Sequence, residues 1–398
     1  MALLQTLPRL APTAGPHAAD RPTPPGRPAV EVVVVVAVEA APDADTLAAW
    51  AGLVSTTPGG DVAQLPAWAR LRGEAGYRPL FVLARAAGEL VGGAMVLHRR
   101  VGPGLRPVAY LPFGPVLRDG PHRAQARDAV CAALAELARR RLAALFVQPL
   151  TGDADVSARL QELGFRPSTA GIAPQASLAV DLSAPVAELH ARMRSGARGS
   201  IKRAVAGGVR VRRGTARDLP AVAALLADTA DHHGFAAASL DHLRAFHAAL
   251  APGGHVEVFL AERDGVPLAA DVLTGAGGVL TLRMTGMRRG DDVRKLGAAA
   301  LLRWETVLAA RAGGYDQLDL GGIPADAVAP LLAGGDLARQ VDGRTYYKAS
   351  FGATPFLRPP AVELIRSPAL RLAYDLARRS ELGGRLLTAV RAALRGSR

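Results

Sequence analysis

The sequence predicts a mixed α/β fold built from two units that repeat the same order of elements. The chain has 398 residues, of which 49% are hydrophobic and 21% charged, which is enough apolar material for two or three domain cores. Strand-like and helix-like segments alternate along residues 29–183 and again along residues 184–360. The hairpin at 83–96 also aligns with the hairpin at 260–272 when one residue is gapped. Together these features favour a tandem duplication.

The first unit follows a leader, residues 1–28, that is rich in proline and alanine, lacks periodicity and is expected to be disordered. A valine-rich strand follows at 32–38, because β-branched side chains favour strands. Apolar periodicity and glycine turns predict the other elements. They are helices at 43–54, 64–72, 125–141 and 157–163, a hairpin of 80–85 and 90–98 that turns at Ala87-Gly88, and strands at 142–148 and 176–181.

The second unit repeats this order before a basic C-terminal segment. Its elements are helices at 219–232, 240–250 and 298–311, a hairpin of 256–262 and 268–274 around Gly265, and strands at 279–284 and 317–320. Residues 361–398 carry eight arginines against three acidic residues, with apolar residues at helical spacing, which predicts a basic helical tail. The tail either packs on the body with its arginines in solvent or attaches the protein to RNA or an anionic membrane face.

The charge balance bears on the partners of the protein. The formal net charge of +13 attracts polyanions such as nucleic acid, nucleotide-sugar pyrophosphates or anionic membranes, although the preference for arginine over lysine also fits the codon bias of a GC-rich genome. The single cysteine, Cys131, excludes an intrachain disulfide framework and a zinc ribbon. No apolar stretch reaches ~18 residues and no signal peptide is recognisable. We therefore expect a cytoplasmic protein, with peripheral contact at the inner membrane face as an open alternative.

The common catalytic motifs are missing from the chain, including GxxxxGK[ST], GxGxxG after a strand, HExxH and GxSxG, and no metal site is expected. One anion-binding candidate remains, the segment 294–299 (RKLGAA), which follows a strand and opens a helix. It has the RxxGxA shape with which N-acetyltransferases of the GNAT type hold the pyrophosphate of coenzyme A. A plain helix start with a basic first turn is the equal alternative.

An ordered set of motifs in the second half is more specific. The basic stretch 193–204 (MRSGARGSIKRA) runs into Gly207-Gly208-Val209, and DHHGF follows at 231–235. The segment LLRWETVLAARAGGYDQLDLGGI at 301–323 and YYKASFG at 346–352 complete the set. In this order and spacing the motifs resemble the FemABX family of aminoacyl-tRNA-dependent peptidyltransferases.

The resemblance to this family covers about residues 30–360. The basic stretch matches the family at Arg198, Ile201, Lys202, Ala204, Gly208 and Val209, and the aromatic motif matches it at Lys348, Phe351 and Gly352, with Tyr347 in the first aromatic place. The first half fits the same template at Gln64 with Trp68, at Tyr110-Leu111-Pro112 with Gly114-Pro115, and at Pro174 with Asp181-Leu182-Ser183.

The resemblance implies two tandem GNAT-like α/β domains, at residues 29–183 and 184–360, with the basic helical tail at 361–398. It also implies transfer of an amino acid from aminoacyl-tRNA to an amine of a cell-wall precursor, UDP-muramyl-pentapeptide or lipid II, with no cofactor besides this co-substrate. Because the ester is already activated, no covalent enzyme intermediate is needed. The protein would position both substrates and stabilise the tetrahedral oxyanion.

The resemblance also implies roles for individual residues. Lys348 matches the family lysine near the tRNA 3′ end, and Tyr347 stands where a family aromatic packs the terminal adenosine, so both are predicted to be catalytic. Arg72, four residues after Trp68, and Arg198 match positions where the family binds precursor phosphates. The further substrate-binding candidates are Trp68, Tyr110, Lys202 and Arg294.

Departures from the family pattern keep other functions open. Phe113 stands where the family often has the arginine of Pro-Arg-Gly-Pro, and Ser200 replaces the usual asparagine. The second domain lacks a long inserted helical hairpin, so the chain is more similar to compact FemX-type members. The change at Phe113 leaves a natural-product acceptor open. Two further alternatives are an acyl-CoA-dependent N-acyltransferase that uses residues 294–299 and a non-catalytic RNA- or membrane-binding protein.

Overall fold

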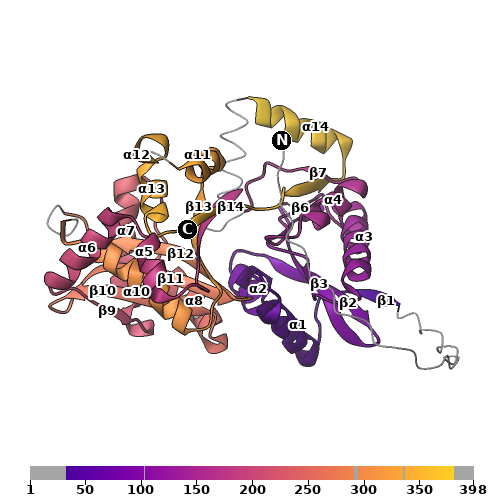
Figure 1. Cartoon of the computed structure of the whole chain (residues 1–398). Coiled ribbons are helices and arrows are strands. Elements are labelled where there is room, and N and C mark those ends of the chain that lie inside the picture. Colours follow the sequence, from indigo (N-terminus) through magenta and orange to yellow (C-terminus); the bar gives the residue numbers. More distant parts are fainter. Residues whose placement is uncertain (1–32, 103, 291–294, 335–336, 381–398) are drawn as a thin grey trace, which may run out of the picture. The chain divides into compact units, whose positions relative to one another are not determined.

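The computed structural model describes residues 33–102, 104–290, 295–334 and 337–380 (Figure 1). Strands in these ranges form two mixed sheets, and helices pack on both. The predicted leader and Arg294 lie outside the described residues, as does the tail beyond residue 380.

The first sheet is built mainly from the first half of the chain. Its order is β1 (Val34–Glu39), β2 (Arg78–Ala86), β3 (Glu89–Arg99), β4 (Val108–Leu111), β6 (Ala144–Val147), β15 (Val362–Ile365) and β7 (Arg166–Pro167), with β5 (Val116–Leu117) also beside β3. The helices of this half are α1 (Ala44–Thr56), η1 (Val62–Gln64), α2 (Pro66–Gly73), α3 (Arg123–Arg141) and α4 (Ala154–Glu162). Only the β4–β6 pair is parallel among these neighbours.

The second sheet repeats this arrangement. Its order is β9 (Arg210–Arg213), β10 (Val256–Arg263), β11 (Val266–Ala276), β12 (Val279–Met287), β13 (Gln317–Ile323), β8 (Ala176–Asp181) and β14 (Thr354–Leu357). Its α-helices are α5 (Val186–Arg192), α6 (Ser195–Ala206), α7 (Leu219–His233), α8 (Leu240–Leu250), α10 (Ala298–Ala312), α11 (Val328–Ala333), α12 (Leu337–Gln340) and α13 (Gly343–Ala349). Helix α14 (Pro368–Arg379) follows β15 and packs on the first sheet. The 3-10 turns are η2 (Ala216–Asp218), η3 (Ala251–Gly253) and η4 (Ala325–Ala327).

The pairing of the strands confirms the predicted duplication. Strand by strand, β1, β2, β3, β4, β6, β15 and β7 correspond to β9, β10, β11, β12, β13, β8 and β14, and the parallel pair falls at the same place in both sheets. The two hairpin turns also agree. Both turn residues have positive φ, 47° and 86° at Ala87-Gly88 and 54° and 74° at Asp264-Gly265, as the twist of a two-residue hairpin requires.

The two halves exchange one strand, which corrects two predicted boundaries. Strand β8, predicted to close the first unit, pairs with β13 and β14 in the second sheet. Strand β15, predicted to belong to the helical tail, pairs with β6 and β7 in the first sheet. The tail is therefore a strand followed by helix α14 within its described part. Local patterns cannot reveal this exchange, because β-propensity does not specify the partner strand.

Apolar packing and polar contacts also join the two halves. One core cluster includes Trp50 and Leu83 from the first half and Val222 and Phe246 from the second. Gly59 N–H donates to Gly277 O (2.8 Å), and Gly277 N–H donates back to Ser55 O (3.0 Å). No helix in the described ranges is long and apolar enough to cross a membrane.

Candidate functional site

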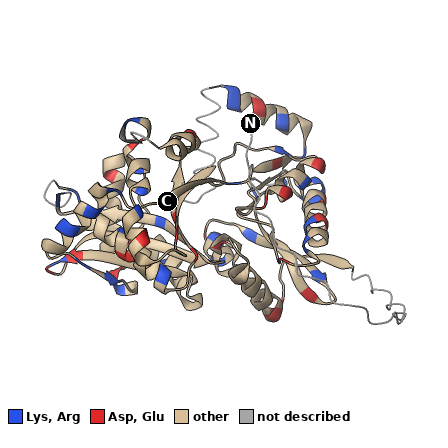
Figure 2. Cartoon of the chain, viewed as in Figure 1, with Lys and Arg blue, Asp and Glu red and all other residues tan. Residues whose placement is uncertain are grey.

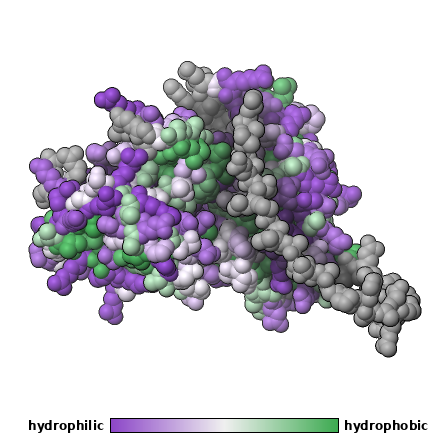
Figure 3. All heavy atoms as spheres, in the orientation of Figure 1, coloured by the Kyte–Doolittle hydropathy of each residue, from purple (hydrophilic) through white to green (hydrophobic). Residues whose placement is uncertain are grey.

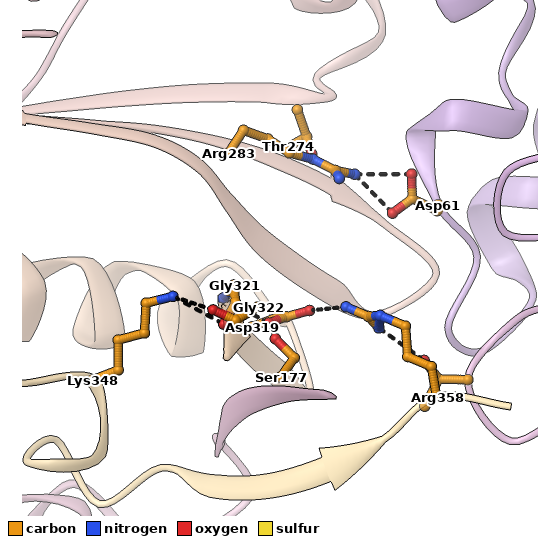
Figure 4. A network of polar contacts seen from close by, with 10 residues as sticks. Asp61, Ser177, Thr274, Arg283, Asp319, Gly321, Gly322, Lys348 and Arg358 are labelled. Carbon is orange, nitrogen blue, oxygen red and sulfur yellow. Dashed lines mark hydrogen bonds and ion pairs between the residues drawn. The ribbon is translucent and has the colours of Figure 1, made fainter. Parts of the chain in front are cut away.

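Lys348 lies where the parallel strands of the second sheet separate. Only Val279–Thr281 of β12 pair with Gln317–Asp319 of β13, although both strands continue beyond these residues. Lys348, on α13, donates from Nζ to the carbonyl oxygens of Gly321 (3.1 Å) and Gly322 (2.8 Å), on the separated part of β13 (Figure 4). The ammonium is thus fixed by two backbone acceptors instead of extending into solvent.

The environment of Lys348 changes its acidity. Burial lowers the pKa of Lys348 to about 8, and the nearby Arg303 guanidinium acts in the same direction. The carboxylate of Asp319 opposes the shift. The side chain is therefore cationic at neutral pH but loses its proton only slightly above it, unlike an exposed lysine.

Asp319 and Arg358 form a buried ion pair beside this lysine. Asp319 Oδ1 accepts hydrogen bonds from Gly321 N–H (2.8 Å) and from Ser177, and Oδ2 accepts one from Arg358 Nη2 (2.9 Å) (Figure 4). The two side chains are only 6% and 8% exposed. Because Gly321 both donates to Asp319 and accepts from Lys348, the ion pair fixes the backbone that holds the lysine.

Arg358 connects this network with the first half of the chain. Its Nη1 donates to Thr151 Oγ1 (3.3 Å), and its guanidinium lies over the rings of Phe113 (5.4 Å) and Phe356 (5.1 Å). The structure therefore places the positive charge of Arg358 over the ring of Phe113, which stands where the family motif often carries arginine. The sequence analysis missed Arg358, which lies in no motif, and gave no role to Asp319 within the segment 301–323, because their pairing depends on the tertiary fold.

Tyr347 precedes Lys348 on α13 and lies partly at the surface. The residue is 37% exposed, and its ring makes an edge contact with Phe351 (5.2 Å between centroids). The hydroxyl end is enclosed by protein, and this burial raises the pKa of Tyr347 despite the opposing charge of Arg303. The structure thus places both predicted catalytic residues within the influence of Arg303, with Tyr347 partly exposed.

A second buried ion pair contains Arg303, whose charge acts on both Lys348 and Tyr347. Arg303 on α10 approaches Asp271 on β11 to 3.0 Å, and Thr285 donates to the same carboxylate (2.7 Å). Burial raises the pKa of Asp271, whereas Arg303 lowers it.

Removal of one partner of this ion pair is expected to destabilise the folded protein. Arg303→Met leaves Asp271, whose side chain is 1% exposed, without its counter-ion, and should reduce the free energy of unfolding by about 3–5 kcal/mol. Urea denaturation measures this loss. The double variant Asp271→Leu/Arg303→Met should recover most of it, because no charge is then buried, and equal losses in the single and double variants would contradict the explanation.

The predicted binding residues of the first half form their own cluster. The Arg72 guanidinium lies 4.9 Å from the Tyr77 ring centre, and Tyr77 and Tyr110 meet edge to face at 5.2 Å. Burial raises the pKa of Tyr110, and the charge of Arg72 beside its hydroxyl opposes the shift. Trp68 Nε1 lies near that hydroxyl without meeting it at hydrogen-bond geometry. The fold thus brings Tyr110 on β4 to the two candidates on α2, Trp68 and Arg72.

The remaining candidates lie apart from Lys348. Arg198 on α6 donates from Nη1 to the carbonyls of Met193 and Ala191, where α5 ends, so the structure gives it a local structural contact. Lys202 is exposed on α6. No hydrogen bond or ion pair among the described side chains joins either residue to Lys348. Their predicted roles in substrate binding stay predictions, as does that of Arg294.

The proposed phosphate loop has another explanation in the fold. Gly297 has a φ of 82° and begins α10, and a Cβ there would lie 2.5 Å from the carbonyl oxygen of Ser200 on α6. Arg203 Nε also donates to Lys295 O (3.3 Å). The glycine therefore permits close approach of α6 to the start of α10. Within the described ranges, no group of three or more His, Cys, Asp or Glu side chains lies close enough to hold a metal ion.

Comparisons with known proteins support this description of the fold. Residues 191–337 match the family model described as acetyltransferase (GNAT) domain. The crystal structure of FemX is similar to the chain with a TM-score of 0.72 and 18% identity, over 82% of this chain and 98% of that one. No curated protein matches in sequence.

Two further solved structures are similar with lower scores. A tandem GNAT protein from the clavulanic acid biosynthesis pathway has a TM-score of 0.50 and 16% identity, over 84% of this chain and 99% of its own. L-PGS from Bacillus licheniformis has a TM-score of 0.51 and 13% identity, over 85% of this chain and 96% of its own.

The chain therefore has the FemX-type fold, two tandem GNAT-like α/β domains, as the motifs implied. The GNAT acyltransferase fold supports a transferase.

Proposed function

We propose that this protein is an N-aminoacyltransferase that moves an amino acid from aminoacyl-tRNA to an amine of a peptidoglycan precursor. The observation that carries the proposal is Lys348, the lysine of the family-like motif, held by two carbonyls where the parallel strands of a FemX-type fold separate. This position combines a fixed positive charge with an opening in the sheet.

The chemistry needs positioning and charge stabilisation from the protein. The acceptor amine attacks the ester carbonyl of aminoacyl-tRNA, a C–N bond forms, and the C–O bond to the terminal ribose breaks. The amine loses a proton and the ribose hydroxyl gains one, so the step is balanced without a cofactor. Lys348 would stabilise the oxyanion of the tetrahedral intermediate as an ammonium. The exposed part of Tyr347 would stack on the terminal adenosine.

The acceptor would bind from the side of the first half. Arg72, Trp68 and Tyr110 supply a cation, an indole and a hydroxyl within one cluster, a combination suited to a phosphate and a sugar ring. The net charge of +13 also suits a reaction in which both substrates are polyanions. Arg198 and Lys202 lie on α6, which packs on α10, and would form a separate basic surface for a polyanionic substrate.

A natural-product acceptor is the second candidate. Phe113 replaces the charge that the family motif often carries, and a tandem GNAT protein of the clavulanic acid pathway is among the similar structures. Arg358, over the Phe113 ring, supports the first candidate because it returns a positive charge to that place. The acyl-CoA alternative is less favoured, since packing against α6 explains Gly297 without a phosphate.

The test incubates the purified protein with radiolabelled aminoacyl-tRNAs and either UDP-muramyl-pentapeptide or lipid II. We expect label on the precursor, lost when Lys348→Ala replaces the wild type. Arg263→Ala is the control, because Arg263 is an exposed basic residue at the end of β10, outside every proposed binding segment, and it should transfer at the wild-type rate.

Two other outcomes would redirect the proposal. Consumption of aminoacyl-tRNA only when a cell extract supplies the acceptor would keep the transferase and favour the natural product. Absence of transfer in both settings, with every charged tRNA intact at the start, would refute the aminoacyl-tRNA reaction. Saturable binding of coenzyme A that Arg294→Glu abolishes would then support the acyl-CoA alternative.

A further inference from the structure

Helix α14 packs on the protein with a polar face. Arg371 forms ion pairs with Glu363 on β15 (2.6 Å) and with Asp375 on its own helix (2.9 Å). The Tyr374 ring lies 6.3 Å from Phe146 on β6. These helix residues, at positions 371, 374 and 375, share one side of the helix. The side chain of Glu363 is fully buried, so the contact anchors the helix firmly.

The opposite face of α14 is apolar and open. One stripe of this helix consists of apolar residues that lie three or four positions apart, namely Ala369, Leu372, Ala373 and Leu376. Leu372 is 61% exposed and Leu376 is 55% exposed, and Leu370 beside them is 43% exposed. A surface helix normally buries its leucines and exposes its charges. This helix instead exposes its leucines, and the ion pairs of Arg371 fix it in that orientation.

Exposed arginines lie at both ends of the apolar stripe. Arg366 precedes the helix, and Arg378, over the Tyr374 ring, and Arg379 end it. Both described acidic residues of this segment, Glu363 and Asp375, are paired with Arg371. Figure 2 shows basic positions on either side of the acidic one along α14. Beyond residue 380 the sequence adds four arginines and a single acidic residue, Glu381. Leucines bordered by unneutralised arginines are the composition of helices that lie in the interface of an anionic bilayer.

We propose that α14 is a docking helix with which the protein binds the surface of a membrane rich in anionic lipid. The leucine stripe would enter the boundary between headgroups and acyl chains while the arginines contact lipid phosphates. RNA would engage the arginines but offers nothing to three exposed leucines, so the lipid surface fits the helix better. The proposal does not depend on the transferase reaction.

The experiment floats the full-length protein with vesicles of phosphatidylglycerol and phosphatidylcholine, and in parallel with phosphatidylcholine alone. We expect binding to the anionic vesicles to exceed binding to the neutral ones at least tenfold, and to weaken strongly between about 50 mM and 500 mM salt. Leu372→Glu/Leu376→Glu should reduce the binding at least tenfold. Arg378→Gln/Arg379→Gln should reduce it about thirtyfold, since each arginine near the surface contributes about 1 kcal/mol, a factor of about five.

A second exposed leucine supplies the matched control. Leu332 on α11 is 70% exposed, and Leu332→Glu should leave binding unchanged. Figure 3 shows hydrophobic side chains gathered in the region of α11, apart from α14. Because the substituted leucines are exposed, each variant should keep the wild-type Tm, which thermal unfolding checks.

Several results would overturn the proposal. Binding that Leu332→Glu abolishes and the α14 variant retains would move the lipid contact to α11. Failure of the wild type to float with anionic vesicles would exclude the membrane as the partner. If sedimentation shows that Leu372→Glu/Leu376→Glu converts a dimer to a monomer, the stripe binds a second copy of the chain. If the stripe is protected from hydrogen exchange and loses this protection when residues 381–398 are deleted, that segment covers the stripe instead.

Discussion

Lys348→Ala is expected to slow amino acid transfer by about 10²–10³-fold, the usual cost of removing one group that stabilises an oxyanion. The variant removes the only described side-chain donor that contacts both the Gly321 and Gly322 carbonyls, at the opening between β12 and β13. Because substrate contacts in the Arg72 cluster are untouched, KM for the acceptor should change little. Single-turnover kinetics with preformed aminoacyl-tRNA measure the rate of the chemical step.

The pH dependence provides an independent check on this role. With a pKa of about 8, Lys348 is charged below that pH and neutral above it. If the ammonium stabilises the oxyanion, kcat should fall as the pH rises through about 8. Lys348→Arg should be slower but should lack this alkaline limb, because guanidinium stays charged. A rate that instead rises through pH 8 and requires the neutral amine would identify Lys348 as a general base and contradict the electrostatic role.

The lowered pKa of Lys348 also makes the stability of the protein depend on pH. Between about pH 8 and the ordinary lysine pKa, the unfolded chain binds a proton at Lys348 that the folded protein does not. The free energy of unfolding should therefore rise with pH in this window relative to Lys348→Met. Equal pH dependence in both proteins would show that the lysine is not desolvated in the folded state.

Local patterns predicted much of the fold. Both hairpins, with their glycine turns, and the two long helices α3 and α10 depend on periodicity and turn chemistry within a few residues. The exchange of β8 and β15 between the sheets was not predictable, because an apolar six-residue strand carries no mark of the sheet that it joins. Helix α6 was recognised only as a basic motif, since its two glycines and its serines weaken the helical pattern.

The site was predicted in part for a similar reason. Lys348 and Tyr347, and the cluster of Arg72, Trp68 and Tyr110, were accessible through motifs. The pairing of Arg358 with Asp319 was not predictable, although Asp319 lies in the motif 301–323. The two residues are 39 positions apart, and the contacts of Arg358 with Thr151 and Phe113 arise only in the folded chain. Arg198 shows the opposite case, in which a motif residue makes contacts that local structure already explains.

Arg358 and Asp319 are expected to act as positioning residues for Lys348, and their substitution should change the pKa of Lys348. Arg358→Met leaves the Asp319 carboxylate buried without its cation, and Asp319→Asn removes that carboxylate from the environment of the lysine. Each variant disturbs the Gly321 backbone that holds Nζ, so we expect about 10–10²-fold slower transfer in both. Loss of activity alone would not distinguish positioning from a general loss of stability.

The acidity of Lys348 makes that distinction, because the two variants shift its pKa in opposite directions. Asp319 favours the ammonium, so Asp319→Asn should lower the pKa of Lys348 below about 8, whereas Arg358→Met, which leaves the carboxylate unneutralised, should raise it. The chain has only three lysines, so competitive labelling with acetic anhydride across a pH series, read by mass spectrometry, resolves each one. Lys202 and Lys295 serve as internal controls that should titrate unchanged. Shifts in the same direction, or equal shifts at all three lysines, would show that Arg358 and Asp319 stabilise the fold without positioning the ammonium.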